Sequence, residues 1–204
     1  RTFAIISHPD AGKTTLTENA LRHAWLNGCV YVNPDRIAQD LFGDWNSPEA
    51  VLKAARHAEE IRRDCLDQGR SFAFETVFST VEKLDFLCEA RGRGFFIRLF
   101  FVGTDGPEIN ASRVLRRMKE GGHAVPIEKI LSRYEKSISN LHAALQIVDR
   151  GYVYDNSIDF EIQELLFRTV NGCVEKTYDT GHEWAERVRR ALPSCDPEDP
   201  PGLD

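Results

Sequence analysis

The segment with the clearest chemical potential is Ser7–Thr15, Ser-His-Pro-Asp-Ala-Gly-Lys-Thr-Thr, which directly follows the apolar run Phe3–Ile6. A short apolar run, a loop ending in Gly-Lys-Thr and a helix-forming stretch are the parts of a phosphate-binding loop. Glycine lets successive backbone N–H groups point at the anion, and the positive end of a helix that begins near Gly12 adds to the attraction. We expect Lys13 to reach the β- and γ-phosphates and Thr14 to hold Mg²⁺ through its hydroxyl.

The loop departs from the usual pattern at its first position, where Ser7 stands in place of glycine. If that position needs a positive φ, serine costs about 1 kcal/mol or more in the strained conformation. The alternative is a chance Gly-Lys-Thr in a surface loop, but the flanking strand and helix patterns favour the phosphate loop. We predict that the nucleotide contacts come from six residues, Asp10, Ala11, Gly12, Lys13, Thr14 and Thr15.

Two further groups of polar residues follow short apolar runs. Asp35 comes after Val30–Val32 and could accept a proton from a substrate hydroxyl or bind Mg²⁺ through water; alternatively, it caps the helix that follows. Glu75 and Thr76 end the run that begins at Phe72 and could orient a polyol or sugar, unless Glu75 simply faces solvent at the edge of a sheet. Ser79 is a third hydrogen-bonding candidate, and also a candidate N-cap of the next helix.

Clustered cations precede a glycine pair in the segment Arg113–Pro126, which includes Arg116, Arg117 and Gly121-Gly122. Arginines on a hinged flap could close over a triphosphate and stabilise charge during transfer, together with Arg133 on the next helix. The alternative is a solvated basic helix face. His123 is expected to order the hinge. A last polar group, Asp155-Asn156-Ser157, either lies near a nucleotide base or forms a simple turn, and we favour the turn.

Alternating strand and helix patterns position these residues. Such alternation predicts an α/β fold with a mainly parallel five-stranded sheet, covered on both faces by helices and followed by a β-hairpin and a last helix. Ligands of such sheets bind beyond the carboxyl ends of the strands, where the polar residues lie. The expected strands are Phe3–Ile6, Val30–Val32, Phe72–Glu75, Phe95–Val102 and Tyr152–Tyr154. The expected helices are Thr14–Trp25, Pro34–Leu41, one that begins at Ser47 and ends at Gly69, Val81–Ala90, Pro107–Lys119, one carrying Ile127 to Leu145, and His182–Leu192. Asn171-Gly172 predicts the hairpin turn.

Composition narrows the class of protein. The 204 residues are 42% hydrophobic and 28% charged, which fits a single domain over residues 1–192 with an acidic, poorly ordered tail over 193–204. The net charge of −6 argues against a strong binder of nucleic acid or of an anionic membrane. Five scattered cysteines without a CxxC pair make a zinc site or a disulfide framework improbable, and indicate a reducing cytoplasm. We see no signal peptide and no apolar run near 18 residues.

Two resemblances arise from these motifs. The first 18 residues resemble the start of bacterial peptide-chain release-factor GTPases, but the N-K-x-D element that reads guanine in those GTPases does not occur. The one D-x-P-G match, Asp199–Gly202, lies in the acidic tail and not between the first strands, where a γ-phosphate sensor is needed. Downstream, the chain resembles the zeta-toxin-like family of small P-loop kinases across residues 29–192. The matching motifs occur in family order and are Tyr31-Val-Asn-Pro-Asp35, Phe72-Ala-Phe-Glu-Thr76, Gly121-Gly-His-Ala-Val-Pro126 with Arg133-Tyr134, and Val153-Tyr-Asp-Asn-Ser157.

The second resemblance implies ATP- and Mg²⁺-dependent phosphorylation of a hydroxyl on a small molecule, which in zeta toxins proper is a UDP-activated amino sugar. It implies that Lys13 and Thr14 bind phosphate and Mg²⁺, that Asp35 is the base, and that Glu75 and Thr76 contact substrate. Arg117 and Arg133 are implied phosphate clamps, and Arg116 could replace Arg117. It also implies a small antitoxin protein as a partner. The alternative functions are a nucleotide-binding toxin–antitoxin or regulatory ATPase without a free acceptor, and a GTPase fragment.

Overall fold

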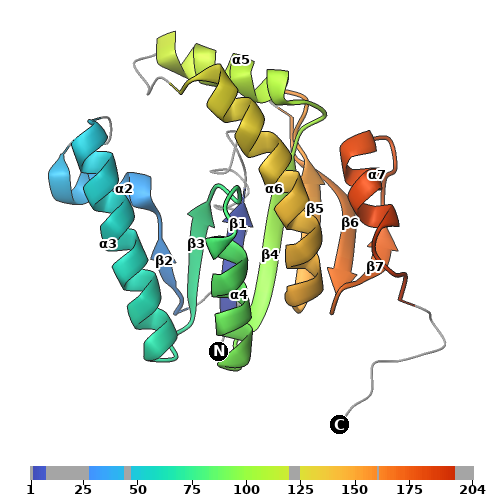
Figure 1. The fold of residues 1–204 in the computed structure, drawn as a ribbon, viewed down its shortest axis with the longest axis horizontal. Helices are drawn as coiled ribbons and strands as arrows, with labels where there is room; N and C mark the ends of the chain where they lie inside the picture. Colours follow the sequence, from blue (N-terminus) through green and yellow to red (C-terminus); the bar gives the residue numbers. More distant parts are fainter. Residues whose placement is uncertain (1, 8–27, 44–46, 120–124, 160, 196–204) are drawn as a thin grey trace.

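The computed structural model describes residues 2–7, 28–43, 47–119, 125–159 and 161–195, and is shown in Figure 1. The predicted first helix, the loop Asp10–Thr15 and the segment Gly121–His123 lie outside these residues. The strands are β1 (Thr2–Ser7), β2 (Val30–Val32), β3 (Phe72–Thr76), β4 (Phe96–Gly103), β5 (Arg150–Asp155), β6 (Glu164–Val170) and β7 (Cys173–Thr177). The described helices are α2 (Pro34–Phe42), α3 (Pro48–Asp67), α4 (Glu82–Gly92), α5 (Pro107–Lys119), α6 (Ile127–Ile147) and α7 (Glu183–Arg190).

The strands form one sheet in the order β2-β3-β1-β4-β5-β6-β7. The first five are parallel to one another, as predicted, whereas β5–β6 and β6–β7 pair antiparallel. The predicted hairpin is confirmed at Asn171 (φ 47°) and Gly172 (φ 83°), the two left-handed residues that a tight hairpin turn of this kind requires. The hairpin extends the parallel sheet, so the sheet has seven strands where the sequence predicted five.

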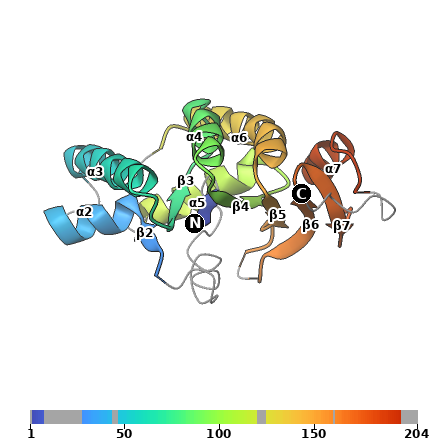
Figure 2. The ribbon, with the colours of Figure 1, turned by 90° about the horizontal axis from the view of Figure 1, so that it is seen from below.

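The main core lies on one face of the sheet, beneath α3, α4, α6 and α7 (Figure 2). Phe72, Phe74, Phe86 and Phe95 pack there, mostly edge to face, an arrangement that adds about 0.5–1.5 kcal/mol per pair beyond simple burial. A smaller cluster on the opposite face contains Ala73, Phe100 and Val102 and packs against several tyrosines. The sequence predicts helices on both faces; of the described helices, these four gather on one.

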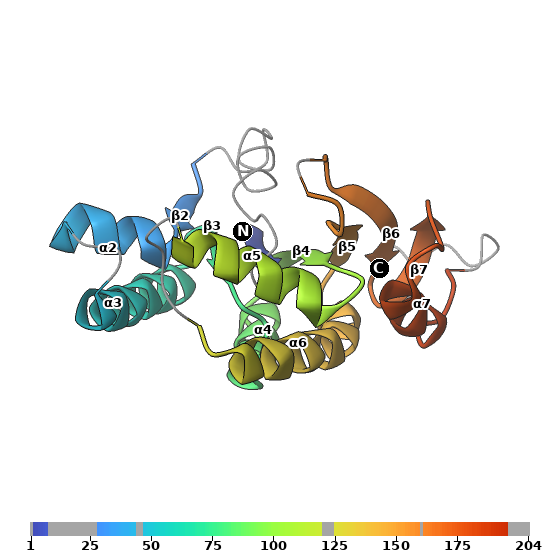
Figure 3. The ribbon, with the colours of Figure 1, turned by 90° about the horizontal axis from the view of Figure 1, so that it is seen from above.

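The helix ends follow local capping signals. Ser47 is the N-cap of α3 and its hydroxyl accepts a hydrogen bond from the backbone N–H of Ala50, with Pro48 in the first turn. The helix α5 has the predicted bounds, and it lies beyond the carboxyl ends of β1 and β3 when the sheet is seen from above (Figure 3). The cations of α5 are therefore held over the edge where ligands of parallel sheets bind.

Candidate active site

The predicted acidic residues converge at one edge of the sheet. In the registers of the parallel pairs, Ser7 at the end of β1 lies opposite Thr76 on β3 and Phe101 on β4. The strand β2 lies on the other side of β3, so Asp35, just after β2, reaches the same edge. Lys13, Thr14 and the other predicted nucleotide contacts lie outside the described residues, but the chain enters their segment from the centre of this edge.

Asn33, and not Asp35, caps the helix α2. The side-chain oxygen of Asn33 accepts hydrogen bonds from the backbone N–H groups of Asp35 at 2.9 Å and Arg36 at 3.3 Å. Pro34 occupies the first helical position, where a missing N–H costs nothing. The capping alternative for Asp35 is therefore wrong. Asp35 stands in the first turn with its side chain exposed, where the helix dipole favours a negative charge.

Glu75 is buried and connected to β2 through a tyrosine. Its side chain is 9% exposed, so the alternative of a solvent-facing edge glutamate is wrong. The Tyr31 hydroxyl donates a short hydrogen bond to the Glu75 carboxylate and accepts one from the Asn33 side-chain amide at 3.1 Å. Tyr31 and Asn33 are two residues apart and share one side of the chain. This network orients Glu75 and links it to the loop that carries Asp35.

Tyr31 and Asn33 are functional candidates that sequence reasoning did not single out, although both stand in the segment quoted for its resemblance. The signal for Asn33 was present, because asparagine followed by proline is typical of a helix N-terminus. The role of Tyr31 had no local signal, because its partner Glu75 is 44 residues away.

Thr76 and Ser79 lie in the chain that leaves β3. The Thr76 hydroxyl donates a hydrogen bond to the carbonyl oxygen of Val77 at 3.4 Å. The side chains of Thr76 and Ser79 are half-buried. Ser79 is not the N-cap of α4: that helix begins at Glu82, and its N-cap, Val81, makes no side-chain capping bond. The prediction was wrong because the helix starts later. The side chain of Thr80 forms a hydrogen bond with the Glu82 carboxyl, and this bond is the main cause that lowers the pKa of Glu82.

Two of the arginines on α5 pair with a single carboxylate. Arg116 Nη1 and Arg113 Nε each lie 2.7 Å from an oxygen of Asp159, and these hydrogen bonds lower the pKa of Asp159. Arg113 is buried, whereas Arg116 and Arg117 are exposed. Arg133 is half-buried on α6. Arg116, the alternative clamp, is thus paired with Asp159, and Arg117 and Arg133 remain predicted clamps.

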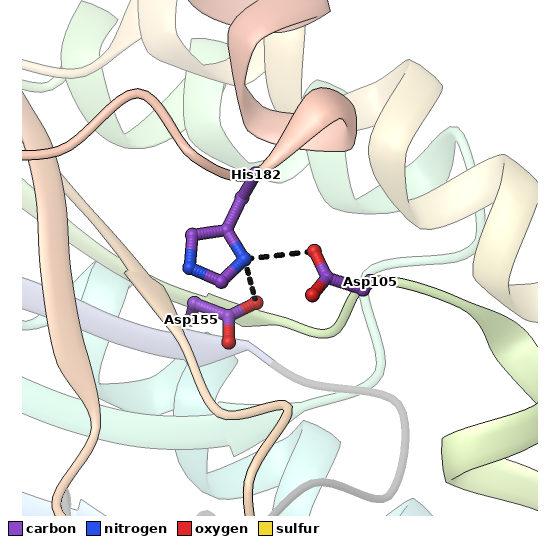
Figure 4. Close-up of side chains that lie close together, drawn as sticks. All are labelled: Asp105, Asp155 and His182. Carbon is purple, nitrogen blue, oxygen red and sulfur yellow. Dashed lines mark hydrogen bonds and ion pairs between the residues drawn. The ribbon is translucent and has the colours of Figure 1, made fainter.

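The other half of the same edge holds a dense cluster around His182 (Figure 4). His182 Nδ1 lies 2.7 Å from Asp105 and 3.4 Å from Asp155, and its Nε2 faces Asp179 at 3.7 Å and Glu164 at 4.0 Å. Burial alone would lower the pKa of His182, but the hydrogen bond to Asp105 and the nearby carboxylates outweigh it and raise the pKa above 6.5. His182 is thereby favoured as a cation between acids.

Asp155 acts as an anchor in this cluster. Its oxygens accept hydrogen bonds from the Ser157 backbone N–H at 2.6 Å, the Ser157 hydroxyl at 2.9 Å and the Trp184 indole at 3.1 Å. The Trp184 ring lies against Gly103, where an added Cβ would come within 2.3 Å of the ring. Asp155 ends β5, its carboxylate binds the N–H of Ser157 two residues further on, and its bond to Trp184 fastens α7 to β5.

Comparison with known proteins assigns the chain to a family. Residues 5–162, more than half of the chain, match the family model described as Zeta toxin. The chain belongs to the zeta toxin family. The matched segment includes the candidate residues of β2, β3, α5 and α6, and the family resemblance drawn from the sequence is confirmed.

Solved structures show the same fold. One belongs to the PezAT toxin–antitoxin system of Streptococcus pneumoniae, with a TM-score of 0.61 and 16% identity over 95% of this chain and 78% of that chain. Another is the AvrRxo1-ORF1:-ORF2 complex with ATP, with a TM-score of 0.62 and 18% identity over 100% of this chain and 65% of that chain. The α/β fold class predicted from the sequence is confirmed by these matches.

Two curated relatives match shorter segments. A Haemophilus influenzae protein described as uncharacterized is 27% identical over 105 residues, which are 52% of this chain and 74% of that protein. Peptide chain release factor 3 of Nitrosomonas europaea is 40% identical over 73 residues, which are 32% of this chain but 13% of the release factor. The second likeness concerns one segment only, in agreement with the missing guanine-reading elements.

None of the described helices combines the length and the apolar character that crossing a membrane requires.

Proposed function

We propose that this zeta-toxin family member is an ATP-dependent phosphotransferase that transfers the terminal phosphoryl group of ATP to a hydroxyl of a small molecule. The observation that carries the proposal is the position of Asp35. Its carboxylate stands at the carboxyl edge of the parallel sheet, and it is spared from helix capping because Asn33 performs that task. An exposed carboxylate in that position suits a general base.

Each candidate residue at the carboxyl edge of the sheet has a separate role in this proposal. The chain passes from Ser7 at the centre of the edge into Asp10–Thr15, the segment whose sequence suits a nucleotide. Lys13 would hold phosphate and Thr14 would hold Mg²⁺, and the bound nucleotide would supply the phosphoryl group. Asp35 takes the proton from the acceptor hydroxyl. Glu75, held by Tyr31, and Thr76 orient the acceptor, while Arg117 and Arg133 balance negative charge over the edge.

Two observations favour a second candidate, a nucleotide-binding toxin or regulatory ATPase that is controlled by a small protein partner and has no free acceptor. PezAT is described as a toxin–antitoxin system, and AvrRxo1-ORF1 is described together with a second chain and ATP. Both candidates bind ATP; they differ in whether a phosphorylated small molecule accumulates.

The deciding experiment incubates the protein with labelled ATP and a metabolite extract and identifies the labelled product. Asp35→Asn is expected to slow product formation by about 10²- to 10⁴-fold, because the base is lost, with ATP affinity largely kept. Asp40→Asn is the matched control, since it removes another exposed acid of the same helix. Label released only as inorganic phosphate would favour the second candidate. Full turnover by Asp35→Asn would remove Asp35 as the base.

The nucleotide loop needs a separate test. Lys13→Ala should weaken ATP binding in an equilibrium titration, because Lys13 is expected to contact the phosphates. An unchanged dissociation constant would contradict the assignment of the loop. A preference for GTP over ATP in the same titration would revive the GTPase alternative.

A further inference from the structure

Two cysteines, Cys173 and Cys195, lie side by side at the outer edge of the sheet. Cys173 is the first residue of the edge strand β7, and Cys195 lies in the exposed segment that follows α7. Both are free thiols, and their side chains form a hydrogen bond with each other. The strand β7 is at the opposite end of the sheet from β2, so this pair is separate from Asp35 and the candidate active site.

Backbone hydrogen bonds hold the segment of Cys195 against β7. The Val174 N–H donates to the carbonyl oxygen of Pro193 at 2.7 Å, and the Cys195 N–H donates to the carbonyl oxygen of Val174 at 3.0 Å. Val174 and Ser194 thereby form a parallel bridge. The segment 193–195 is therefore held in place beside the start of β7, where the other cysteine lies.

The two thiols lie on the face of β7 opposite the main core. Val174 is buried in the main core, and side chains alternate along a strand, so Cys173 and Glu175 project to the other face. The charges that act on Cys195 from this surface are those of Glu175 and of Arg150 on β5. Burial, followed by the hydrogen bond to Cys173, raises the pKa of the Cys195 thiol. Cys195 is therefore protonated at neutral pH, and its reactions as a thiolate are slow.

The two thiols differ in exposure, and this difference gives each of them a different part in a reaction with an external disulfide. Cys195 is exposed, so a low-molecular-weight disulfide can reach its sulfur. Cys173 is half-buried beside it. A second thiol in that position can resolve the mixed disulfide that forms first.

We propose that Cys173 and Cys195 form a reversible intrachain disulfide by exchange with a low-molecular-weight disulfide, and that this bond fastens α7 to the sheet. The Cys195 thiolate attacks one sulfur of the external disulfide and releases one thiolate. The Cys173 thiolate then attacks the Cys195 sulfur and releases the second thiolate. The two protons lost by the cysteines go to the two released thiolates, so the chain is oxidised by two electrons and the external disulfide is reduced by two. In a reducing compartment both cysteines stay as thiols.

The disulfide closes a loop that contains α7. The loop runs from Cys173 to Cys195 and includes His182 of the acidic cluster and Trp184, whose ring lies against Gly103 on β4. A cross-link restricts the open or unfolded chain more than the folded one. Oxidation is therefore expected to suppress local opening of α7, and it does so without any part in phosphoryl transfer.

The test treats the reduced protein with oxidised glutathione at about pH 8.5, near the ordinary pKa of cysteine, where more thiolate is present. Remaining thiols are alkylated and linked peptides are identified by mass spectrometry. Trypsin cuts after Arg168, Lys176 and Arg190, so the disulfide joins peptide 169–176 to peptide 191–204. We expect this link to form at about a tenfold lower ratio of oxidised to reduced glutathione in the folded protein than in urea, because the fold holds the thiols together.

Two variants control the assignment. Cys195→Ser removes the exposed thiol of the pair, so peptide 169–176 should form no cross-link. Cys88→Ser is the matched control, because Cys88 is also exposed but lies on α4, and this variant should keep the link. Glutathione adducts without the link, equal linkage of Cys173 to Cys88, or equal ratios in folded and unfolded protein would overturn the disulfide.

Hydrogen exchange measures the effect on α7. In the oxidised parent protein, the amides of α7 should exchange about tenfold more slowly than in the reduced protein, because the loop is closed. The amides of α4, which lies outside the loop, should exchange at the same rate in both forms. Cys195→Ser treated with oxidised glutathione should show no slowing. Equal exchange of α7 in the oxidised and reduced parent would overturn the claim that the bond fastens this helix.

Discussion

The two halves of the carboxyl edge use carboxylates in opposite ways. At the β4–β5 half, Asp155 accepts hydrogen bonds from Ser157 and Trp184 and faces His182. These contacts give the Asp155 carboxylate a structural role, because they attach α7 to the sheet. At the β2–β3 half, Glu75 accepts a hydrogen bond from Tyr31, and Asp35 stands exposed while Asn33 caps the helix. A carboxylate at such an edge is therefore a candidate for catalysis when another residue performs the structural role, as Asn33 does when it caps α2 in place of Asp35.

The strongest challenge to this comparison is to remove one acid from each half. Asp155→Ala should lower the free energy of unfolding by about 2–4 kcal/mol, because the Trp184 indole and the Ser157 N–H lose a buried acceptor. Asp35→Ala, its counterpart at the other half, should change it by less than about 0.5 kcal/mol. Urea denaturation measures both. Similar losses in the two variants would mean that Asp35 is also structural.

Tyr31→Phe sharpens the comparison within the β2–β3 half. The variant keeps the ring but removes the hydroxyl from Glu75, so we expect a loss of about 1 kcal/mol in unfolding free energy and a higher KM for the acceptor. Tyr178→Phe is the control, because that ring is 45% exposed and should change neither quantity. A stability loss without any change in KM would show that Tyr31 supports the fold but does not position Glu75 for substrate.

The smallest expected effect is the pH dependence of the β4–β5 half. The pKa of His182 is raised in the folded chain, so its contribution to stability is fully present below pH 6.5 and is lost as pH rises through the raised value. Asp105, Asp155, Asp179 and Glu164 are the acids that face it. His182→Gln should therefore remove a fall in unfolding free energy above pH 6.5, whereas His57→Gln, on the exposed side of α3, should keep it. Parallel pH profiles for His182→Gln and the parent protein would contradict this reading.

Local signals in the sequence predicted most of the fold. The bounds of β2 and α5 agree with the prediction to the residue, and the hairpin turn was identified from Asn171-Gly172, because periodicity, capping and turn chemistry act between near neighbours. The expected cap at Ser79 failed because a serine several residues before an apolar pattern does not fix where the first helical turn forms. The start of the helix was therefore misplaced.

The site was predicted less completely than the fold. Asp35 and Glu75 were predicted as site residues from their place after strands, a rule that needs only the order of elements. The Tyr31–Glu75 bond and the contact between His182 and Asp105, which are 44 and 77 residues apart in sequence, depend on which strands become neighbours. A single sequence does not state that order, and so neither contact was foreseen.

The most direct test of the account is a crystal structure of the protein with a non-hydrolysable ATP analogue and Mg²⁺. The account predicts the terminal phosphate at the centre of the carboxyl edge, bound by the segment after Ser7. It further predicts that the Asp35 carboxylate faces the phosphate across a gap that admits one hydroxyl oxygen, about 3 Å from each group. An analogue bound elsewhere, or an Asp35 side chain directed away from the phosphate, would contradict the central claim.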